Sequence, residues 1–278
     1  MSALVSVILP VHNRKDLIKR ALKSVIDQIF TDFEIIVVDD CSTDGMTEDE
    51  IVLLDKRIRY HRLPFHCGVS KARNDGVRIS KGKWIAFIDS DDEWLKQKLK
   101  KQIQWTRSHE EFEIVQTKEI WIRNGKRVNT PKTHEKFEGD LFYAGLDRCM
   151  ITPSSVLLTR SLFDRAGGFN ESLPACEDYD LWLRICRNHP VGLIDEYLLI
   201  RYGGHSDQLS ANVMGLDRFR IRTILGLLER NQLHESQKLV AITTLKQKAT
   251  VVANGYLKRG NPELYERFIS IVKRFDSE

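Results

Sequence analysis

Residues 84–92 read WIAFIDSDD, an apolar run that stops abruptly at a group of aspartates. Residues 6–9 (SVIL), followed by Pro10, and residues 33–38 (FEIIVV), followed by Asp39-Asp40, have the same form. Continuous apolar runs, unlike alternating ones, are typical of strands that are covered on both faces, as in a parallel sheet. The three runs therefore predict three buried strands with polar ends.

Helical patterns of apolar residues separate these runs. Residues 14–28, 47–55 and 69–78 are predicted helices, and residues 58–63 form a further short strand. This β-α-β-α rhythm predicts an α/β fold with a mostly parallel, doubly wound sheet. In such sheets ligands bind beyond the carboxyl ends of the strands, where the polar residues of this chain fall.

The second half of the chain is more mixed. Strands are predicted at residues 112–122 and 156–159, a helix at 177–187, and a polar loop at 130–136. From residue 215 the pattern is wholly helical, with amphipathic stretches at 237–257 and 262–275. We therefore expect one domain over residues 1–210, with halves at 1–105 and 106–210, and a C-terminal helical extension over 211–278.

The composition is that of an ordinary globular protein, with 42% hydrophobic and 29% charged residues. The five cysteines are an odd number without a CxxC pair, which predicts reduced thiols in a cytosolic protein. The first residues lack a basic leader, and no apolar run reaches the ~20 residues that a membrane span needs. We expect a cytoplasmic protein.

Positive charge is concentrated near the end of the chain. Residues 211–278 contain twelve Lys/Arg and seven Asp/Glu, a net charge of +5, whereas the whole chain carries +4. Arg218, Arg220, Arg222 and Arg230 could contact anionic lipid, which would make the protein peripheral at the inner membrane face. The preferred alternative is a packed helical cap or homodimer surface with a solvated basic face. No nucleic-acid motif accompanies these charges.

Asp89 and Asp91 stand two residues apart at the end of a predicted strand. Carboxylates at this spacing present oxygens to a shared point, and oxygen ligands suit Mg²⁺ or Mn²⁺, which can clamp a diphosphate. The DxD pattern alone is weak, because chance produces it on the order of once in such a chain. Asp178-Tyr179-Asp180 repeats it. The buried strand before Asp89 favours the first copy, since carboxylates there need a cation or donors.

Other candidate residues are weaker on spacing alone. Asp39 could accept from a ribose hydroxyl or a base N–H, or could cap the next helix, and Asp40 is more simply structural. Arg73 could fork to a phosphate, but a solvated helix face is the simpler interpretation.

Two further segments carry ionisable groups. Glu177 and Asp178 begin a predicted helix, where a carboxylate stays ionised and could act as a general base, although helix capping explains them better. His205 lies in the polar stretch GGHSDQ, from which it could reach a metal or a phosphate, although a lone histidine is usually structural.

Six segments in order resemble glycosyltransferase family 2, whose members have the GT-A fold. They are VSVILPVHNR, FEIIVVDDCSTDG, GVSKARNDG, WIAFIDSDDEW, GGFNE and EDYDLWLR, spread over residues 4 to 210. The resemblance implies a nucleotide-binding half at 1–105 and an acceptor half at 106–210. It implies a metal-dependent transfer of a sugar from a nucleotide-diphosphate donor, with a UDP-sugar expected, to an acceptor hydroxyl.

The resemblance also implies residue roles. The nucleotide would be held by residues at the strand ends and on the third helix, and a loop containing His205 would close over the donor. Asp91, with Asp89, would ligate Mn²⁺ or Mg²⁺, and Asp178 would be the general base with Glu177 as its neighbour. The donor-site residues are Pro10, Val11, Asp39, Arg73, Asp89, Ser90 and His205.

Membrane spans and a QxxRW motif, common in processive members, do not occur, which favours addition of a single sugar. The implied mechanism is one displacement with inversion, in cell-surface glycan or polysaccharide synthesis on a glycan or lipid-linked acceptor. One alternative is a sugar nucleotidyltransferase, which would need a glycine-rich loop where this chain has PVHNRKD. Another is a nucleotide-sugar-binding scaffold without catalysis, in which we would expect some of the acidic residues Asp39, Asp89, Asp91, Glu177 and Asp178 to be replaced, whereas all are present.

Overall fold

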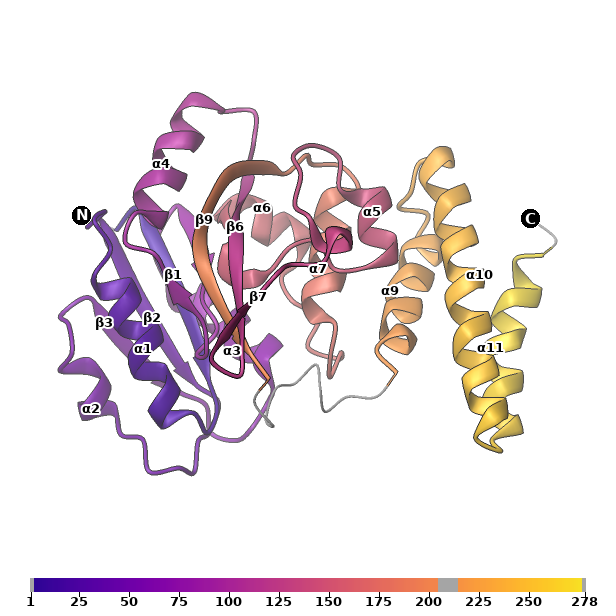
Figure 1. Ribbon diagram of the computed structural model, residues 1–278, viewed down its shortest axis with the longest axis horizontal. Coiled ribbons are helices and arrows are strands. Elements are labelled where there is room, and N and C mark those ends of the chain that lie inside the picture. Colours follow the sequence, from indigo (N-terminus) through magenta and orange to yellow (C-terminus); the bar gives the residue numbers. More distant parts are fainter. Residues whose placement is uncertain (1–2, 205–214, 277–278) are drawn as a thin grey trace.

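One continuous sheet runs through the first two thirds of the chain, in a computed structural model that describes residues 3–204 and 215–276 (Figure 1). The strand order is β3-β2-β1-β4-β8-β6-β9-β5, with β7 paired to β6. The first four strands in the chain are parallel: β1 (Val5–Val11), β2 (Phe33–Asp39), β3 (Ile58–Arg62) and β4 (Trp84–Phe87). β1 lies between β2 and β4, so the three predicted strand ends are neighbours.

The second half of the sheet is mixed rather than parallel. β8 (Leu157–Thr159) is antiparallel to both β4 and β6 (Ile114–Arg123). β9 (Gly192–Gly203) is parallel to β6 but antiparallel to β5 (Glu93–Trp94), and β7 (Lys126–Val128) closes a hairpin with β6. The expected parallel sheet thus holds for the first half. Two parallel strands that follow each other in the chain need a long crossover connection between them, usually a helix. The second half of the chain does not alternate strands and helices regularly, so most of its strand pairs are antiparallel.

Both faces of the parallel strands are covered, as their continuous apolar runs predict. Val7 and Leu9 of β1 pack with α1 (Lys15–Ile26) and α4 (Lys98–Ser108) in one core cluster. Ile8 points to the opposite face and joins a second cluster with α3 (Val69–Ile79) and the helices of the second half. The remaining elements are α2 (Glu48–Val52), α5 (Phe142–Asp147), α6 (Arg160–Ala166), α7 (Glu177–Cys186), and the 3₁₀ turns η1 (Lys132–His134) and η2 (Pro153–Ser155).

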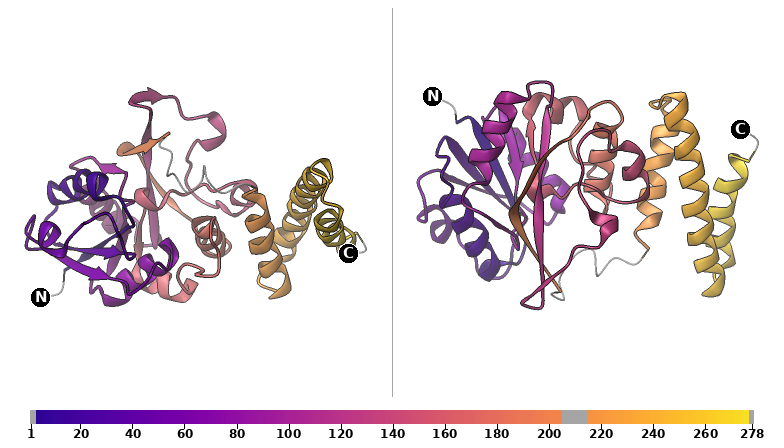
Figure 2. Two further views of the ribbon diagram at one scale, coloured as in Figure 1. Left: turned by 90° about the horizontal axis from the view of Figure 1, so that it is seen from below. Right: turned by 45° about the horizontal axis from the view of Figure 1, so that its top comes forward.

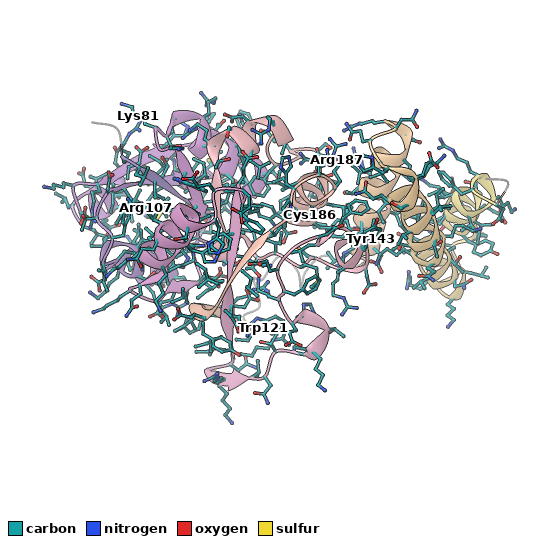
Figure 3. All side chains as sticks on the ribbon, turned by 90° about the horizontal axis from the view of Figure 1, so that it is seen from above. Lys81, Arg107, Trp121, Tyr143, Cys186 and Arg187 are labelled. Atoms are coloured by element: carbon teal, nitrogen blue, oxygen red, sulfur yellow. The ribbon has the colours of Figure 1, made fainter. Side chains whose placement is uncertain are left out.

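The C-terminal helices extend the second core cluster. α9 (Asp217–Glu229) packs against α7, α10 (Glu235–Lys258) packs against α9 and α5, and α11 (Pro262–Arg274) lies outermost against α10 (Figures 1 and 2). Figure 3 shows Tyr143 and Arg187 where this extension meets the second half of the sheet domain. Tyr143 is hydrogen-bonded to Ser236, and the Arg187 guanidinium donates to the Gln232 carbonyl. The extension therefore shares its core with the rest of the chain.

The arginines that suggested lipid contact are partly engaged within the fold. Arg220 is ion-paired with Asp217, and Arg222 donates to Ser172. These contacts favour the packed-cap interpretation for both residues. In residues 3–204 and 215–276, no helix combines the length and apolar character of a membrane span.

Gly76 allows α3 to approach β1 closely. A Cβ atom added at this glycine would lie 2.5 Å from Ile8 Cγ2 and 3.1 Å from Val38 Cγ2. Gly226, inside α9, offers a contrast, because no atom lies within 4 Å of a Cβ built there. The first glycine is required by packing, whereas the second is not.

We expect Gly76→Ala to lower the free energy of unfolding by about 1–3 kcal/mol, because the extra methyl overpacks the core. Gly226→Ala is the matched control and should raise the free energy of unfolding by up to about 1 kcal/mol, since alanine favours a helix. Urea denaturation of the two variants measures both effects. Equal stability of the two variants would contradict the close approach of α3 to β1.

Candidate active site

A cleft of about 1370 Å³ opens at the carboxyl ends of β1 and β4. One wall comes from the first 105 residues: residues 10–14, residues 68–73 at the start of α3, and the turn 89–92 after β4. The opposite wall comes from β6, residues 148–153 and the start of α7. A drug-sized ligand fills about 300–1,000 Å³. The cleft therefore has room for two substrates.

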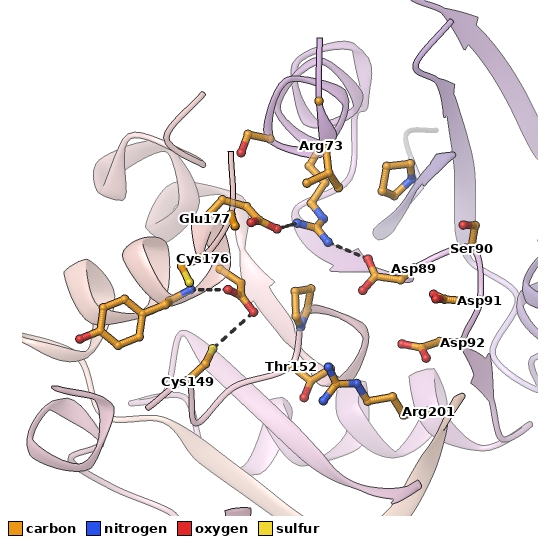
Figure 4. A pocket seen from close by; sticks show the side chains of 18 of the residues that line it. Arg73, Asp89, Ser90, Asp91, Asp92, Cys149, Thr152, Cys176, Glu177 and Arg201 are labelled. Carbon is orange, nitrogen blue, oxygen red and sulfur yellow. Dashed lines mark hydrogen bonds and ion pairs between the residues drawn. The ribbon is translucent and has the colours of Figure 1, made fainter. Parts of the chain in front are cut away.

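The turn after β4 presents three aspartates to the cleft. Figure 4 shows Asp89, Asp91 and Asp92 along one edge of it, with Ser90 beside them. Asp92 is only 2% exposed. Burial, together with the negative charges of Asp89 and Asp91, raises the pKa of Asp92 well above its usual value. This excess of negative charge fits a divalent cation bound by carboxylate oxygens.

Arg14 is the charged neighbour of this turn that the sequence analysis did not identify. Its guanidinium lies 2.6 Å from Asp91 Oδ2, and the Arg20 guanidinium donates to the Asp91 backbone carbonyl. The expected metal ligand Asp91 therefore already has a cationic partner. Arg14 is the last residue of the VSVILPVHNR segment and follows β1, which is the neighbour of β4 in the sheet. Its place just after a neighbouring strand end was the one feature of the sequence that could have predicted its contact with Asp91.

Arg73 holds carboxylates from both walls of the cleft. Its Nη2 donates to Asp89 at 2.7 Å, and its Nη1 donates to Glu177 at 2.8 Å (Figure 4). The side chain is almost fully buried, and the two carboxylates raise the pKa of the guanidinium against the effect of burial. Arg73 thus lines the cleft as expected, but its terminal nitrogens are already engaged with Asp89 and Glu177.

Glu177 and Asp178 begin α7 directly opposite the aspartate turn. Burial and the adjacent Asp178 raise the pKa of Glu177, while Arg73 opposes the change. Asp178 Oδ1 accepts from the Tyr179 backbone N–H at 2.7 Å, and Oδ2 lies 3.4 Å from the Cys149 thiol. Burial and the neighbouring Asp178 keep Cys149 protonated by raising its pKa. The helix start therefore presents a carboxylate oxygen to the cleft.

Asp39 lies at the end of β2 as predicted, but it does not line the cleft. It is fully buried and accepts hydrogen bonds from the Ser42 backbone N–H, from the Tyr60 hydroxyl and from Arg62. Burial would raise the pKa of Asp39, but these hydrogen bonds outweigh it and lower the pKa. The cleft is lined at this strand end by the next residue, Asp40, instead.

Asp40 has the structural role that we expected. Its carboxylate accepts from the backbone N–H groups of Cys67 and Gly68, at the start of α3. It also pairs with His66, whose ring stacks on that of His12 at 4.0 Å. Ligating atoms of His12, Asp40 and His66 lie within 4.8 Å of one another, so this group is a second candidate for a metal.

The aspartate turn is the better candidate for a metal, because it brings three carboxyl groups to the cleft, whereas the Asp40 carboxylate is held by the backbone N–H groups of the two residues before α3. The structure brings Pro10, Val11, Arg73, Asp89 and Ser90 to one cleft together with the residues proposed for metal binding and catalysis, Asp91, Glu177 and Asp178. Only Asp39 does not line it. His205 lies outside the described residues.

Residues 106–210 line the cleft with a buried ionic group. Glu119 of β6 lies 3.3 Å from Lys136 Nζ and 3.8 Å from an Arg201 nitrogen, and it accepts from the Trp121 indole N–H. Burial alone would raise the pKa of Glu119, but Lys136 and Arg201 outweigh it and lower the pKa to about 2. These residues were missed because nothing in their local sequence distinguishes them from strand and loop residues.

Comparison with known proteins now assigns the family. Residues 6–166 match the family Glycosyl transferase family 2, so the chain belongs to that family. Its sequence is 33% identical over 218 residues to the Escherichia coli UDP-Glc:alpha-D-GlcNAc-diphosphoundecaprenol beta-1,3-glucosyltransferase WfaP, covering 75% of this chain and 80% of WfaP. Over 104 residues, 37% of this chain and 41% of the relative, it is 42% identical to the putative teichuronic acid biosynthesis glycosyltransferase TuaG of Bacillus subtilis.

Other relatives are much longer than this chain. An uncharacterized glycosyltransferase of Rickettsia conorii is 35% identical over 204 residues, which are 70% of this chain but 32% of that protein. Among solved structures, residues 1–349 of TarS from S. aureus, in complex with UDP-GlcNAc, match with a TM-score of 0.66 at 18% identity. The match covers 100% of this chain and 92% of the TarS fragment, which confirms the predicted GT-A fold.

We expect Glu119→Gln to lower the free energy of unfolding at pH 7 by roughly 3 kcal/mol. This value is the change in the pKa of Glu119 on folding multiplied by 1.36 kcal/mol per pKa unit. The pKa of Glu119 is lowered on folding from 4.5 to about 2, so the ionised carboxylate stabilises the protein above pH ~4.5. This contribution is lost as the pH falls from about 4.5 to about 2. The difference from the wild type should therefore shrink over that range.

Urea denaturation at pH 7 and at lower pH values measures this difference. Glu196→Gln is the control, because Glu196 is an exposed carboxylate on β9 and pairs with Lys101 at the surface. It should change the free energy of unfolding by less than about 1 kcal/mol. A pH-independent loss in Glu119→Gln would contradict the ionic interpretation.

Proposed function

We propose that this chain transfers a single sugar from a UDP-sugar to an acceptor hydroxyl, with inversion, in the synthesis of a cell-surface glycan. One observation carries the proposal: the carboxylates of the aspartate turn and of Asp178 line the same cleft from opposite walls. A sugar nucleotide bound along the aspartate turn would place its leaving group there. The acceptor would then approach from the side of Asp178.

The donor end of the cleft is formed by Pro10 and Val11, beside the stacked rings of His12 and His66. This arrangement supports a base and ribose at the end of β1, in the position where doubly wound sheets bind ligands. The relatives support uridine: WfaP is a UDP-Glc-dependent glucosyltransferase, and the TarS structures contain UDP-GlcNAc or UDP. Because Asp39 is fully buried, its contact with the nucleotide requires a movement of the side chains that cover it.

Asp91 and Asp89 would hold Mn²⁺ or Mg²⁺, with the buried Asp92 carboxyl group beside them. Such an ion, when bound, neutralises the charge of a leaving diphosphate. Arg73 keeps Asp89 in place and joins it to Glu177 on the other wall. This ion-pair network supports a fixed spacing between the donor site and the proposed base.

Asp178 is the proposed general base. Its Oδ1 is held by the Tyr179 N–H, so Oδ2 is the oxygen that would take the proton of the acceptor hydroxyl. The acceptor oxygen forms a bond to the anomeric carbon while the bond from that carbon to the diphosphate breaks. A single displacement of this kind inverts the anomeric configuration. Glu177 is paired with Arg73 and would position the helix start.

The acceptor is proposed to be a glycan or a lipid-linked sugar. The WfaP name specifies a diphosphoundecaprenol-linked acceptor, which supports work at the inner membrane face. Contact of the C-terminal helices with lipid, and pairing of two copies through these helices, both remain predictions. The contacts of Arg220 and Arg222 within the fold favour a packed cap over a lipid-binding face.

Asp178→Asn should retain donor binding and lose ~10²–10⁴-fold in turnover, the usual contribution of a general base. The amide keeps the shape of the carboxylate but cannot take the proton. Transfer and slow donor hydrolysis are measured with UDP-sugars and Mn²⁺, and Asp195→Asn, at an exposed position on β9, is the control. Full turnover in Asp178→Asn would remove Asp178 from this role, and donor binding without any turnover in the wild type would support a scaffold.

Asp91→Ala should abolish the part of donor binding that depends on metal. Removal of this carboxylate takes away a charged oxygen ligand and leaves Arg14 without its partner at that site. Calorimetry of UDP binding, with Mn²⁺ and with a chelator, separates the metal-dependent part. Asp195→Ala should behave as the wild type, and an unchanged Mn²⁺ effect in Asp91→Ala would refute the assignment.

A further inference from the structure

The acceptor half lines the cleft with four cations that the proposed donor chemistry does not use. We call Arg123, Lys136, Arg148 and Arg201 the cationic wall. They come from β6, from the loop after β7, from the segment after α5, and from β9. Glu119 is the carboxylate with which Lys136 and Arg201 of this wall are paired, whereas Glu177 and Asp178 lie at the start of α7. The wall therefore differs in charge from the aspartate turn opposite.

The four cations are close to one another in space. Lys136 and Arg201 share Glu119, and Arg201 and Arg123 both lie over the Trp121 ring, at 5.6 and 5.4 Å from its centroid. The His134 ring also packs against Trp121, with 5.4 Å between the ring centroids. Figure 3 places Trp121 on the β6–β7 side of the molecule, and Figure 4 shows Arg201 reaching into the cleft between Cys149 and Asp92.

Arg148 completes the group. It pairs with Asp147, which is 60% exposed and does not line the cleft, and it donates to the Thr133 carbonyl next to His134. Burial, and then the charges of Arg148 and Arg201, lower the pKa of His134, which agrees with this crowding of cations. The loop that carries His134 is therefore enclosed by positive charge.

The cationic wall has more positive charge than its partners neutralise. Counting direct ion pairs, the four positive charges meet the carboxylates of Glu119 and Asp147, which leaves an excess of two. In the described part of the chain, no carboxylate pairs with Arg123. A single carboxylate or phosphodiester carries one negative charge, whereas a diphosphate that links two groups carries two. Arginine side chains also match phosphate oxygens with two parallel hydrogen bonds.

We propose that the acceptor carries a diphosphate next to the sugar that is glycosylated, and that the cationic wall binds this diphosphate. The inference rests on the proposed function, because it assigns the donor to the aspartate turn and leaves the wall for the acceptor. It names Arg148 and Arg123 as residues that determine acceptor specificity. The sugar hydroxyl would then point inward to Asp178, with the diphosphate toward the β6–β7 side.

The test compares variants in which one cation is lost. Arg148→Gln and Arg123→Gln remove charge from partly exposed side chains, so the fold should be retained. Arg127→Gln is the matched control: Arg127 lies on β7 of the same hairpin, is exposed and does not line the cleft. Circular dichroism and the melting temperature establish that all three variants are folded like the wild type.

Binding is measured by calorimetry with three probes: N-acetylglucosamine linked through a diphosphate to a short alkyl chain, the same sugar as a neutral alkyl glycoside, and UDP with Mn²⁺. We expect Arg148→Gln and Arg123→Gln each to weaken binding of the diphosphate probe about tenfold, the size of a lost charge-assisted hydrogen bond. Binding of the neutral glycoside and of UDP should change less than about twofold, as should all binding by Arg127→Gln.

Two results would overturn the inference: unchanged binding of the diphosphate probe in both variants, or a loss of UDP binding equal to the loss of the diphosphate probe. The second result would assign the wall to the donor. A poly(alditol phosphate) probe, whose phosphodiesters each carry one negative charge, should bind more weakly than a long-chain lipid diphosphate, and tighter binding of the polymer would overturn the inference. Binding that depends on the charge of the probe, without any sugar transfer, would support diphosphate binding by the cationic wall and reject the proposed function. Sugar transfer that does not depend on the charge of the acceptor would support the proposed function and reject diphosphate binding by the wall.

Discussion

The buried guanidinium of Arg73 is the constraint on which the rest of the site depends. A charge with 3% exposure is tolerated only when it is paired, and Arg73 is paired with Asp89 after β4 and with Glu177 at the start of α7. The next residue, Asn74, bonds both the N–H and the carbonyl of Phe169. One turn of α3 therefore holds the two walls of the cleft at a set spacing.

This spacing separates charge across the cleft. The aspartate turn is acidic enough that burial and its neighbours raise the pKa of Asp92, whereas the opposite side gathers Lys136 and Arg201 around Glu119. A cleft with this division suits two anionic substrates that bind in different ways, one through a divalent cation and one through arginine. Asp178 lies where the two regions meet, and Arg201 is within electrostatic reach of it.

Local patterns in the sequence predicted most elements within a few residues. The continuous run at 33–38 is β2 with one further residue, and the expected helix at 69–78 is α3 (Val69–Ile79). The predicted helix at 47–55 is shorter, because its capping box at Thr47 starts it and the chain leaves the helix after Val52. The sequence did not predict that β8 is antiparallel to β4. The direction of a strand depends on where the chain returns to the sheet rather than on the residues of that strand.

The sequence by itself determined the family, the parallel half of the sheet and the gathering of acidic residues at strand ends, because period and motif order are local properties of the chain. Only the tertiary structure decided which carboxylates face the cleft. Asp39 turns to Tyr60 and Arg62 of the neighbouring strand, Asp91 meets Arg14, and the cationic wall is assembled from four distant segments. Electrostatic pairing acts through space between residues that are far apart in the chain, so no local pattern records it.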